Sequence, residues 1–392
     1  MNNDKIYISI NYYNSFIFAN EIQSQYVQLT KKKKDPMYKK VLAGIMVLSV
    51  IANFVMAQDE YFEPGFSVGG YGEFHYNSAK VGEADASKKM DFHRFIIYYG
   101  YNWTEKWSFK SEVELEHNYV KDGNGELELE QAYINYHSDK FGFQAGVILP
   151  SVGLINDFHE PPLFLSVERP DYSKYIIPTT WFGNGLAAYG QIGAFSWKAV
   201  MHEGLNGDGI ASKWSQGIRG GRQKGYKANA EEMLYNGRIA YTGIPGLRVG
   251  ASYTTTKALR SEEGVNPIGV SLMEFHAKYD AKGIMAVAEW GNISYTDHSV
   301  KSSTGYYMDL GYDIGKMINL DGKLYPWVRI TDINPGVGHE SEDSKHYSKM
   351  VFGLTYKPIN QIAFKLDYGT KTYTDSEKDK TTYMNFGVGY NF

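Results

Sequence analysis

The sequence predicts an all-β fold, a transmembrane antiparallel β-barrel of about 16 strands with short turns at one end and long loops at the other. Aromatic residues make up 15% of the 392 residues and glycine occurs 41 times, a composition that favours strands and tight turns. From Phe66 onward, apolar and polar residues alternate with a period of two. The connections between the alternating segments are in turn short and long, as in outer-membrane barrels.

The C-terminal run shows the alternation best, because Met384, Phe386 and Val388 share one face while Asn385 and Gly387 share the other. The expected strands are 66–76, 90–103, 107–119, 126–137, 141–149, 183–192, 194–203, 228–242, 247–257, 269–280, 283–295, 304–314, 323–332, 347–357, 361–374 and 380–392. The expected short turns are 104–106, 138–140, 244–246, 281–283 and 358–360, and the longer loops include 77–89, 150–180, 204–227, 258–268 and 333–346.

Two soluble folds with many strands compete with the barrel. A β-sandwich rarely holds this many half-apolar strands. A β-propeller should show a blade repeat of about 40–50 residues, and the sequence shows none. The barrel also explains an export signal at the start of the chain.

The N-terminal part of the chain divides into three segments before the barrel. Residues 37–57 combine Lys39 and Lys40, an apolar run and small residues before Gln58, which predicts a cleaved signal peptide rather than an uncleaved anchor. Residues 1–36 precede this signal, so we expect Met37 to be the true start and 1–36 to be a mis-annotated or disordered extension. Residues 58–65 form a short segment, and 66–392 form the barrel.

The stretch from Trp107 to His117 places Glu112, Glu114 and Glu116 at every second position. Trp107, Phe109, Val113 and Leu115 then share the lipid-facing side, while Lys110 and the three glutamates face the water-filled lumen. In the next strand the parity changes near Gln131. Either a β-bulge shifts the phase there, or Glu126 and Glu128 stand above the membrane.

The sequence does not indicate an enzyme, a cofactor or a metal site. The chain has no cysteine, which excludes disulfides and thiolate ligands. His159 and Glu160 begin a zinc-protease-like motif, but no second histidine follows and prolines interrupt the helix that the motif needs. The net charge of −4 does not indicate nucleic acid as a partner. The basic tract 218–227 is expected to be an external loop, either simply solvated or facing lipopolysaccharide phosphates or an incoming anion.

Three stretches resemble the porin O/P family of outer-membrane channels: residues 92–117, 128–137 and 142–154. The shared features are the basic Arg94 that opens a strand, the segment "QAYINY" and the segment "AGVILPSVGL". The resemblance implies a 16-stranded barrel, a homotrimer and a loop folded into the pore. It also implies, for some members, selectivity for phosphate and other anions through lumen arginines and lysines.

The residues on the non-lipid face carry both signs of charge in equal number. The expected channel-lining cations are Arg94, Lys110, Lys198, Arg238, Arg248, Lys278, Arg329 and Lys365, and the anions are Glu112, Glu114, Glu116, Glu274, Glu289, Asp309, Asp313 and Asp367. A phosphate pore needs a basic excess along its path. We therefore expect weak or mixed selectivity.

The long loop 150–181 is the expected constriction, with an external cap that never enters the pore as the alternative. Its charged residues could set a field across the opening: Asp157, His159, Glu160, Glu168, Arg169, Asp171 and Lys174. The terminal Phe392 resembles the signal read by the barrel-assembly machinery. Trp181, Trp197 and Trp214 could form a sugar track or belong to the aromatic girdles of any barrel.

The sequence therefore predicts a passive outer-membrane porin for small hydrophilic solutes and ions, contacting the lipid bilayer and lipopolysaccharide. The alternatives are a substrate-specific channel for phosphate or oligosaccharides and, less favoured, a barrel enzyme.

Overall fold

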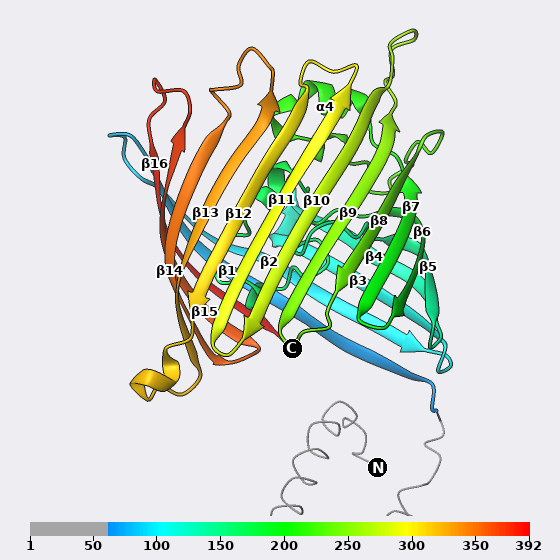
Figure 1. Cartoon of the computed structure of the whole chain (residues 1–392), viewed down its shortest axis with the longest axis horizontal. Helices are drawn as coiled ribbons and strands as arrows, with labels where there is room; N and C mark the ends of the chain where they lie inside the picture. The colour runs from blue at the N-terminus through cyan, green and yellow to red at the C-terminus, as the bar shows by residue number, and fades with distance from the viewer. Residues whose placement is uncertain (1–61) are drawn as a thin grey trace, which may run out of the picture. The chain divides into compact units, whose positions relative to one another are not determined.

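A computed structural model describes residues 62–392, and the expected signal peptide and the segment before it lie outside them. The described chain forms a closed antiparallel barrel in which each strand pairs with the next and β1 pairs with β16 (Figure 1). The strands are β1 (Gly65–Val81), β2 (Ser87–Asn102), β3 (Trp107–Lys121), β4 (Asn124–His137), β5 (Phe141–Ile148), β6 (Gly183–Ile192), β7 (Phe195–Glu203), β8 (Met233–Tyr241), β9 (Leu247–Ala258), β10 (Ile268–Ala281), β11 (Ile284–Thr296), β12 (Ser302–Tyr312), β13 (Lys323–Val337), β14 (Tyr347–Ile359), β15 (Ile362–Tyr373) and β16 (Thr381–Asn391). The predicted fold class is confirmed.

The alternation in sequence becomes an outer apolar face and an inner face. On the outside, Phe352 of β14 is 54% exposed and Leu366 of β15 is 49% exposed. On the inside, Thr355 and Lys365 of the same strands are buried. Outward apolar side chains at this density are what a bilayer requires of a barrel.

The connections differ between the two ends of the barrel, and the C-terminus lies at the end with the shorter ones (Figure 1). Two connections depart from the expected pattern. The β3–β4 hairpin at the long-loop end is only residues 122–123, and the β12–β13 connection at the short-turn end runs through 313–322 with the 3-10 helix η4 (Gly315–Ile318). Strand β8 also begins at Met233 instead of residue 228, because 204–232 is a loop that contains α4 (Gly207–Ser212), η2 (Trp214–Gln216) and η3 (Arg219–Gly221).

Within residues 62–392, no helix has the length and apolar character needed to cross a membrane.

A β-bulge in β2 and another in β4 change which residues face inward. In β2, Glu73 opposes Arg94 and Phe74 opposes Phe92, so His93 is the extra residue. In β4, Glu112 opposes Gln131 and Val113 opposes Leu129, so Glu130 is the extra residue. The bulge expected near Gln131 is therefore present.

The barrel closes at its N- and C-terminal strands. The amide of Gly70 donates to the carbonyl of Phe392 at 2.9 Å, and the amide of Phe392 donates back to Gly70 at 2.9 Å. The Phe392 ring is exposed and stacks on Phe95 of β2 at 6.0 Å between centroids.

Candidate channel lining and lumen loop

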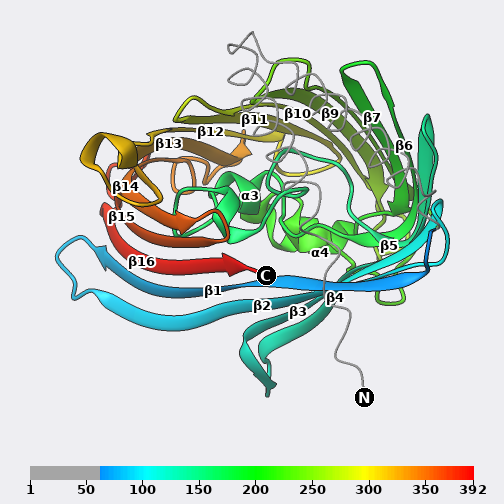
Figure 2. The same ribbon diagram turned by 90° about the horizontal axis from the view of Figure 1, so that it is seen from below.

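Residues 149–182, between β5 and β6, form the lumen loop, which lies inside the barrel (Figure 2). It contains the 3-10 helix η1 (Pro161–Leu163) and the short helix α3 (Tyr172–Tyr175). Gly153 has a φ of +67°, and a Cβ built there would lie 2.6 Å from a Glu289 oxygen of the wall. The loop thus follows the wall closely, and polar side chains of the strands hold its backbone.

The first part of the lumen loop is fixed to β7, β8 and β11. Asp157 pairs with Arg238 and also accepts from the Ser151 hydroxyl at 2.8 Å. The amide of Leu154 donates to Glu289 at 3.1 Å. Lys198 donates to the carbonyl of Leu149 at 3.1 Å. Three of the predicted lining residues therefore bind the loop.

The middle of the loop is held by lysines of β10 and β15. Lys365 donates to the carbonyls of Pro161 and Ser166 at 2.7 and 2.8 Å, and its ammonium lies 3.8 Å from the centroid of the Phe164 ring. Lys278 donates to the carbonyl of Leu163 at 3.4 Å. These cations bind loop carbonyls in preference to lining an open lumen.

His159 fastens the loop to β3. Its Nε2 lies 3.0 Å from Oε1 of Glu112, and both side chains are buried. Burial opposes the charge on His159, but the adjacent Glu112 carboxylate outweighs it and raises the pKa of His159 to about 9. This contact is therefore an ion pair at neutral pH.

The last part of the loop reaches the strands next to the seam. Glu168 lies 3.0 Å from His75 Nδ1 of β1 and accepts from Asn77 at 2.8 Å. Asp171 accepts from the hydroxyl of Tyr347 at 2.9 Å and from Lys349 at 3.2 Å. Burial raises the pKa of Asp171, but the adjacent Lys349 more than offsets this, so the net pKa is below the ordinary value.

Arg329 and Asp309 form a bidentate ion pair on the inner wall. Its Nε and Nη2 donate to the two oxygens of Asp309, each at 2.6 Å, and its Nη1 donates to the carbonyl of Glu168 at 3.4 Å. A bidentate guanidinium–carboxylate pair is rigid and has little charge left for an incoming solute. Nearby, Asp367 accepts from the amide of Val167 at 2.8 Å.

Arg94 of β2 lies between two carboxylates, Glu73 of β1 and Glu114 of β3. Its Nε is 2.6 Å from Glu73 and its Nη1 is 3.3 Å from Glu114. Glu116, two residues further along β3, is only half-buried. Lys110 is exposed near the other end of this strand. The predicted inward orientation of the three glutamates agrees with this arrangement.

The remaining predicted residues occupy varied places. Glu274 is fully buried between Ser252 and His276, and Arg248 lies over the Phe158 ring at 5.0 Å. Arg169 donates to Tyr71 and to the carbonyl of His159, at 3.4 and 3.2 Å.

One prediction was wrong: Asp313 lies beyond β12, where it accepts from the amides of Gly315 and Leu324 and shapes the turn. Glu160 is half-buried without an ion pair in the described chain, and Lys174 is exposed and lies over Tyr175 of its own helix.

Two features of the interior have no counterpart in the charge pattern of the sequence. The first is Glu130, which the bulge turns inward, where it is buried beside Glu112, Glu114 and His159. The second is an apolar core, in which Ile176 and Trp181 of the lumen loop pack against residues of the loop 204–232 and against inward Val270, Leu272 and Ile293 of the wall. The inward Ile, Val and Leu side chains of β10 and β11 thus pack against the loops.

A cavity of about 390 Å³ lies between the lumen loop and the turn 242–246. Arg248, Lys278 and Asp309 contribute to its lining together with apolar residues of the loop. This cavity lies next to candidate lining residues, at the short-turn end of the barrel.

The basic tract and the three tryptophans lie in different surroundings. Arg222 donates to the carbonyl of Thr180 at 2.6 Å, and Lys224 bridges Glu126 and Glu128 of β4, so these cations bind the protein itself. Trp181 is buried, whereas Trp214 stacks on His339 at 3.7 Å. Trp197 faces outward in register with Ile239. The tryptophans do not line one track.

Within the described residues, three groups of histidine and carboxylate side chains lie close enough to share a metal ion. Two share the buried Glu130, and the third is Asp91, His93 and His117 near the long-loop end.

Comparison with known proteins places the chain among barrels of this kind. No family model matches it. Three solved structures share its fold: the anion-selective porin from Comamonas acidovorans (TM-score 0.58, 9% identity, 84% of this chain and 100% of that one), OmpF of Salmonella typhi in complex with daunomycin (0.58, 12%, 83% and 97%), and OmpT of Vibrio cholerae in a trimer form (0.55, 13%, 84% and 100%). The fold is thus a 16-stranded barrel like those of these porins.

A relative found by sequence is close enough to define a family. A protein of Aquifex aeolicus (strain VF5), described only as uncharacterized, is 33% identical over 345 residues, which cover 81% of this chain and 78% of that protein. The chain therefore belongs to the same family as this Aquifex aeolicus protein.

Proposed function

We propose that the protein is a passive diffusion porin of the outer membrane for small hydrophilic solutes and ions, with weak or mixed charge selectivity. The observation that carries this proposal is the pairing of opposite charges on the inner wall. Arg329 pairs with Asp309, Arg238 pairs with Asp157 of the lumen loop, and Arg94 is held between Glu73 and Glu114. A wall of neutralised pairs favours neither sign of ion strongly.

The lumen loop is proposed to set the width of the channel. It is fastened to β3, β8, β11 and β15, through Glu112, Arg238, Glu289 and Lys365, so its backbone is held across the interior. We propose that side chains of the lumen loop, together with the barrel wall, limit the size of the solutes that pass.

Conductance measurements test this function. The folded protein, inserted into a planar bilayer, should give stepwise ohmic currents and a reversal potential near zero in a salt gradient. A barrel that inserts but does not conduct would contradict the porin function. A strong anion preference, with block by phosphate or an oligosaccharide, would favour the substrate-specific channel instead.

Membership of the porin O/P family is a finer proposal that rests on the resemblance of residues 92–117, 128–137 and 142–154. Phosphate selectivity is the less favoured form of it, because Arg329 and Lys349 already contact Asp309 and Asp171. We further propose that the protein is a homotrimer and that it contacts lipopolysaccharide. We also propose that the assembly machinery recognises Phe392 and that the signal peptide is cleaved before Gln58. Intact mass of the purified protein and its mobility before and after heating would test the cleavage and the trimer.

A further inference from the structure

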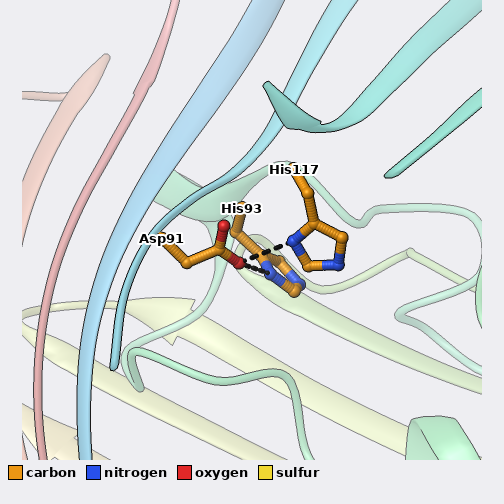
Figure 3. Close-up of side chains that lie close together, drawn as sticks. All are labelled: Asp91, His93 and His117. Atoms are coloured by element: carbon orange, nitrogen blue, oxygen red, sulfur yellow. Dashed lines mark hydrogen bonds and ion pairs between the residues drawn. The ribbon is translucent and has the colours of Figure 1, made fainter. Parts of the chain in front are cut away.

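Three side chains of types that can bind metal ions meet near the long-loop end of β2 and β3. Asp91 and His93 come from β2 and His117 from the end of β3 (Figure 3). The Oδ2 atom of Asp91 lies 3.0 Å from Nδ1 of His93 and 2.8 Å from Nδ1 of His117. The two imidazole rings are 5.4 Å apart between centroids at 76°.

Irregular backbone brings these residues together. His93 is the extra residue of the β2 bulge, and a bulge re-aims the side chain that it inserts. Regular pairing between β3 and β4 stops at Glu116, and His117 follows with a φ of 60°. Non-glycine residues adopt this left-handed region infrequently. Two separate departures from strand geometry thus produce one cluster.

The ligand set has a definite chemical preference. Two imidazole nitrogens and one carboxylate oxygen suit Zn²⁺ and neighbouring transition metals, whereas Ca²⁺ and Mg²⁺ favour oxygen-only sites. Ligand atoms around a tetrahedral zinc ion at about 2.0–2.1 Å are roughly 3.3 Å apart. The spacings of 2.8 and 3.0 Å in the cluster would therefore need to widen by only a few tenths of an ångström.

We propose that Asp91, His93 and His117 bind one divalent transition-metal ion of the Zn²⁺ class, with the fourth position open to water. The side chains are 28%, 24% and 44% exposed, so an ion can reach them without unfolding of the strands. This inference does not depend on the porin function.

The surroundings support a built site. Behind His117, its Nε2 lies 3.9 Å from Oε1 of Glu116, and a carboxylate behind a ligating histidine is a common outer partner. The His93 ring stacks on His75 at 4.8 Å, and His75 contacts Glu168 of the lumen loop. An ion in the cluster would thus sit next to one fastening point of the lumen loop.

The test uses the full-length folded protein in detergent, without a histidine tag. Calorimetric titration with Zn²⁺ should give one site per chain, and H93A and H117A should each weaken binding by roughly tenfold or more. D91N should weaken it less, because an amide oxygen can still ligate. The matched control H137A removes an exposed histidine at the other end of the barrel and should leave binding unchanged.

A second readout separates binding by this cluster from loss of the fold. Cu²⁺ bound to the wild type should show hyperfine coupling to two imidazole nitrogens in its electron paramagnetic resonance spectrum, and H93A should show one. The heat-modified gel mobility of each variant reports whether the barrel is intact. Absence of stoichiometric Zn²⁺ binding, or equal affinity in an intact H93A/H117A double variant, would overturn the proposal and leave the cluster as a hydrogen-bonded clasp between strands.

Discussion

Nε2 of His159 lies 3.0 Å from Oε1 of Glu112, so the loop that crosses the lumen is fastened to strand β3 by a buried ion pair. The partners are 47 residues apart in sequence, and both side chains are buried. A buried charge that loses its partner is costly. This contact is therefore one point at which pH should act on the loop.

The contribution of His159 should fall as pH rises. Its pKa is raised from about 6.5 to about 9 by Glu112 against the opposing effect of burial, so the stabilisation is complete below pH 6.5 and is lost as pH rises through 9. The pKa difference corresponds to about 3 kcal/mol. Current fluctuations in a planar bilayer should increase over this interval in the wild type. H159Q, which keeps a donor but does not titrate, should show no such increase; an equal increase there would assign the effect to other groups.

Lys365→Met should release the middle of the lumen loop. Lys365 is buried and donates to two loop carbonyls, and a hydrogen bond to a charged group contributes about 1.5–3 kcal/mol. We expect lower thermal stability and a larger or noisier single-channel conductance. The control is Lys110→Met, which removes an exposed inward lysine without a hydrogen bond to the loop in the described chain. Similar conductance changes in both variants would point to charge, not to loop release.

Replacing Glu112, Glu114 and Glu116 with glutamine should shift ion selectivity toward anions. The structure separates their contributions, because Glu112 binds His159 and Glu114 binds Arg94, while Glu116 is half-buried and has only a 3.9 Å contact with His117. E116Q should therefore shift the reversal potential with the least structural damage. The shift should be largest at low salt, since the screening length is about 30 Å at 0.01 M and about 3 Å at 1 M.

The matched control for that experiment is E105Q, which removes an exposed glutamate in the short turn at the opposite end of β3. An unchanged reversal potential in E116Q at low salt would show that this carboxylate lies away from the ion path.

A charged side chain on the lipid-facing surface should cost little stability at the edge of the apolar band and more at its centre. Leu366 and Thr370 both face outward on β15, opposite Phe386 and Thr382 of β16, with Thr370 nearer the long-loop end. L366R should cost about 2–4 kcal/mol, and T370R about 0–1 kcal/mol. Denaturant unfolding of the protein folded into lipid vesicles measures both. Equal costs would mean that the apolar band is not centred near Leu366.

The strands were predictable because their period is local. Met350, Phe352 and Leu354 reveal their face through their nearest neighbours, and the lipid environment enforces the pattern at each strand. The barrel follows once the strands are recognised, because closure leaves no exposed edges.

The interior was less predictable because it depends on contacts between distant segments. The sequence indicates that 150–181 is long and charged, but not that Lys365 meets Pro161 across 204 residues. Glu130 was missed because a bulge reverses its parity. The Asp91, His93 and His117 cluster was missed because it needs a second bulge and a left-handed residue.

The position of the lumen loop has a consequence for the order of assembly. The loop precedes β6 in the chain, yet it contacts β14 and β15 near the C-terminus and β1 at the seam, through Lys349, Lys365 and Tyr71. A segment tied to both sides of the seam cannot easily enter after β1 and β16 have joined. We expect the loop to be in place first, as an internal template around which the last strands close.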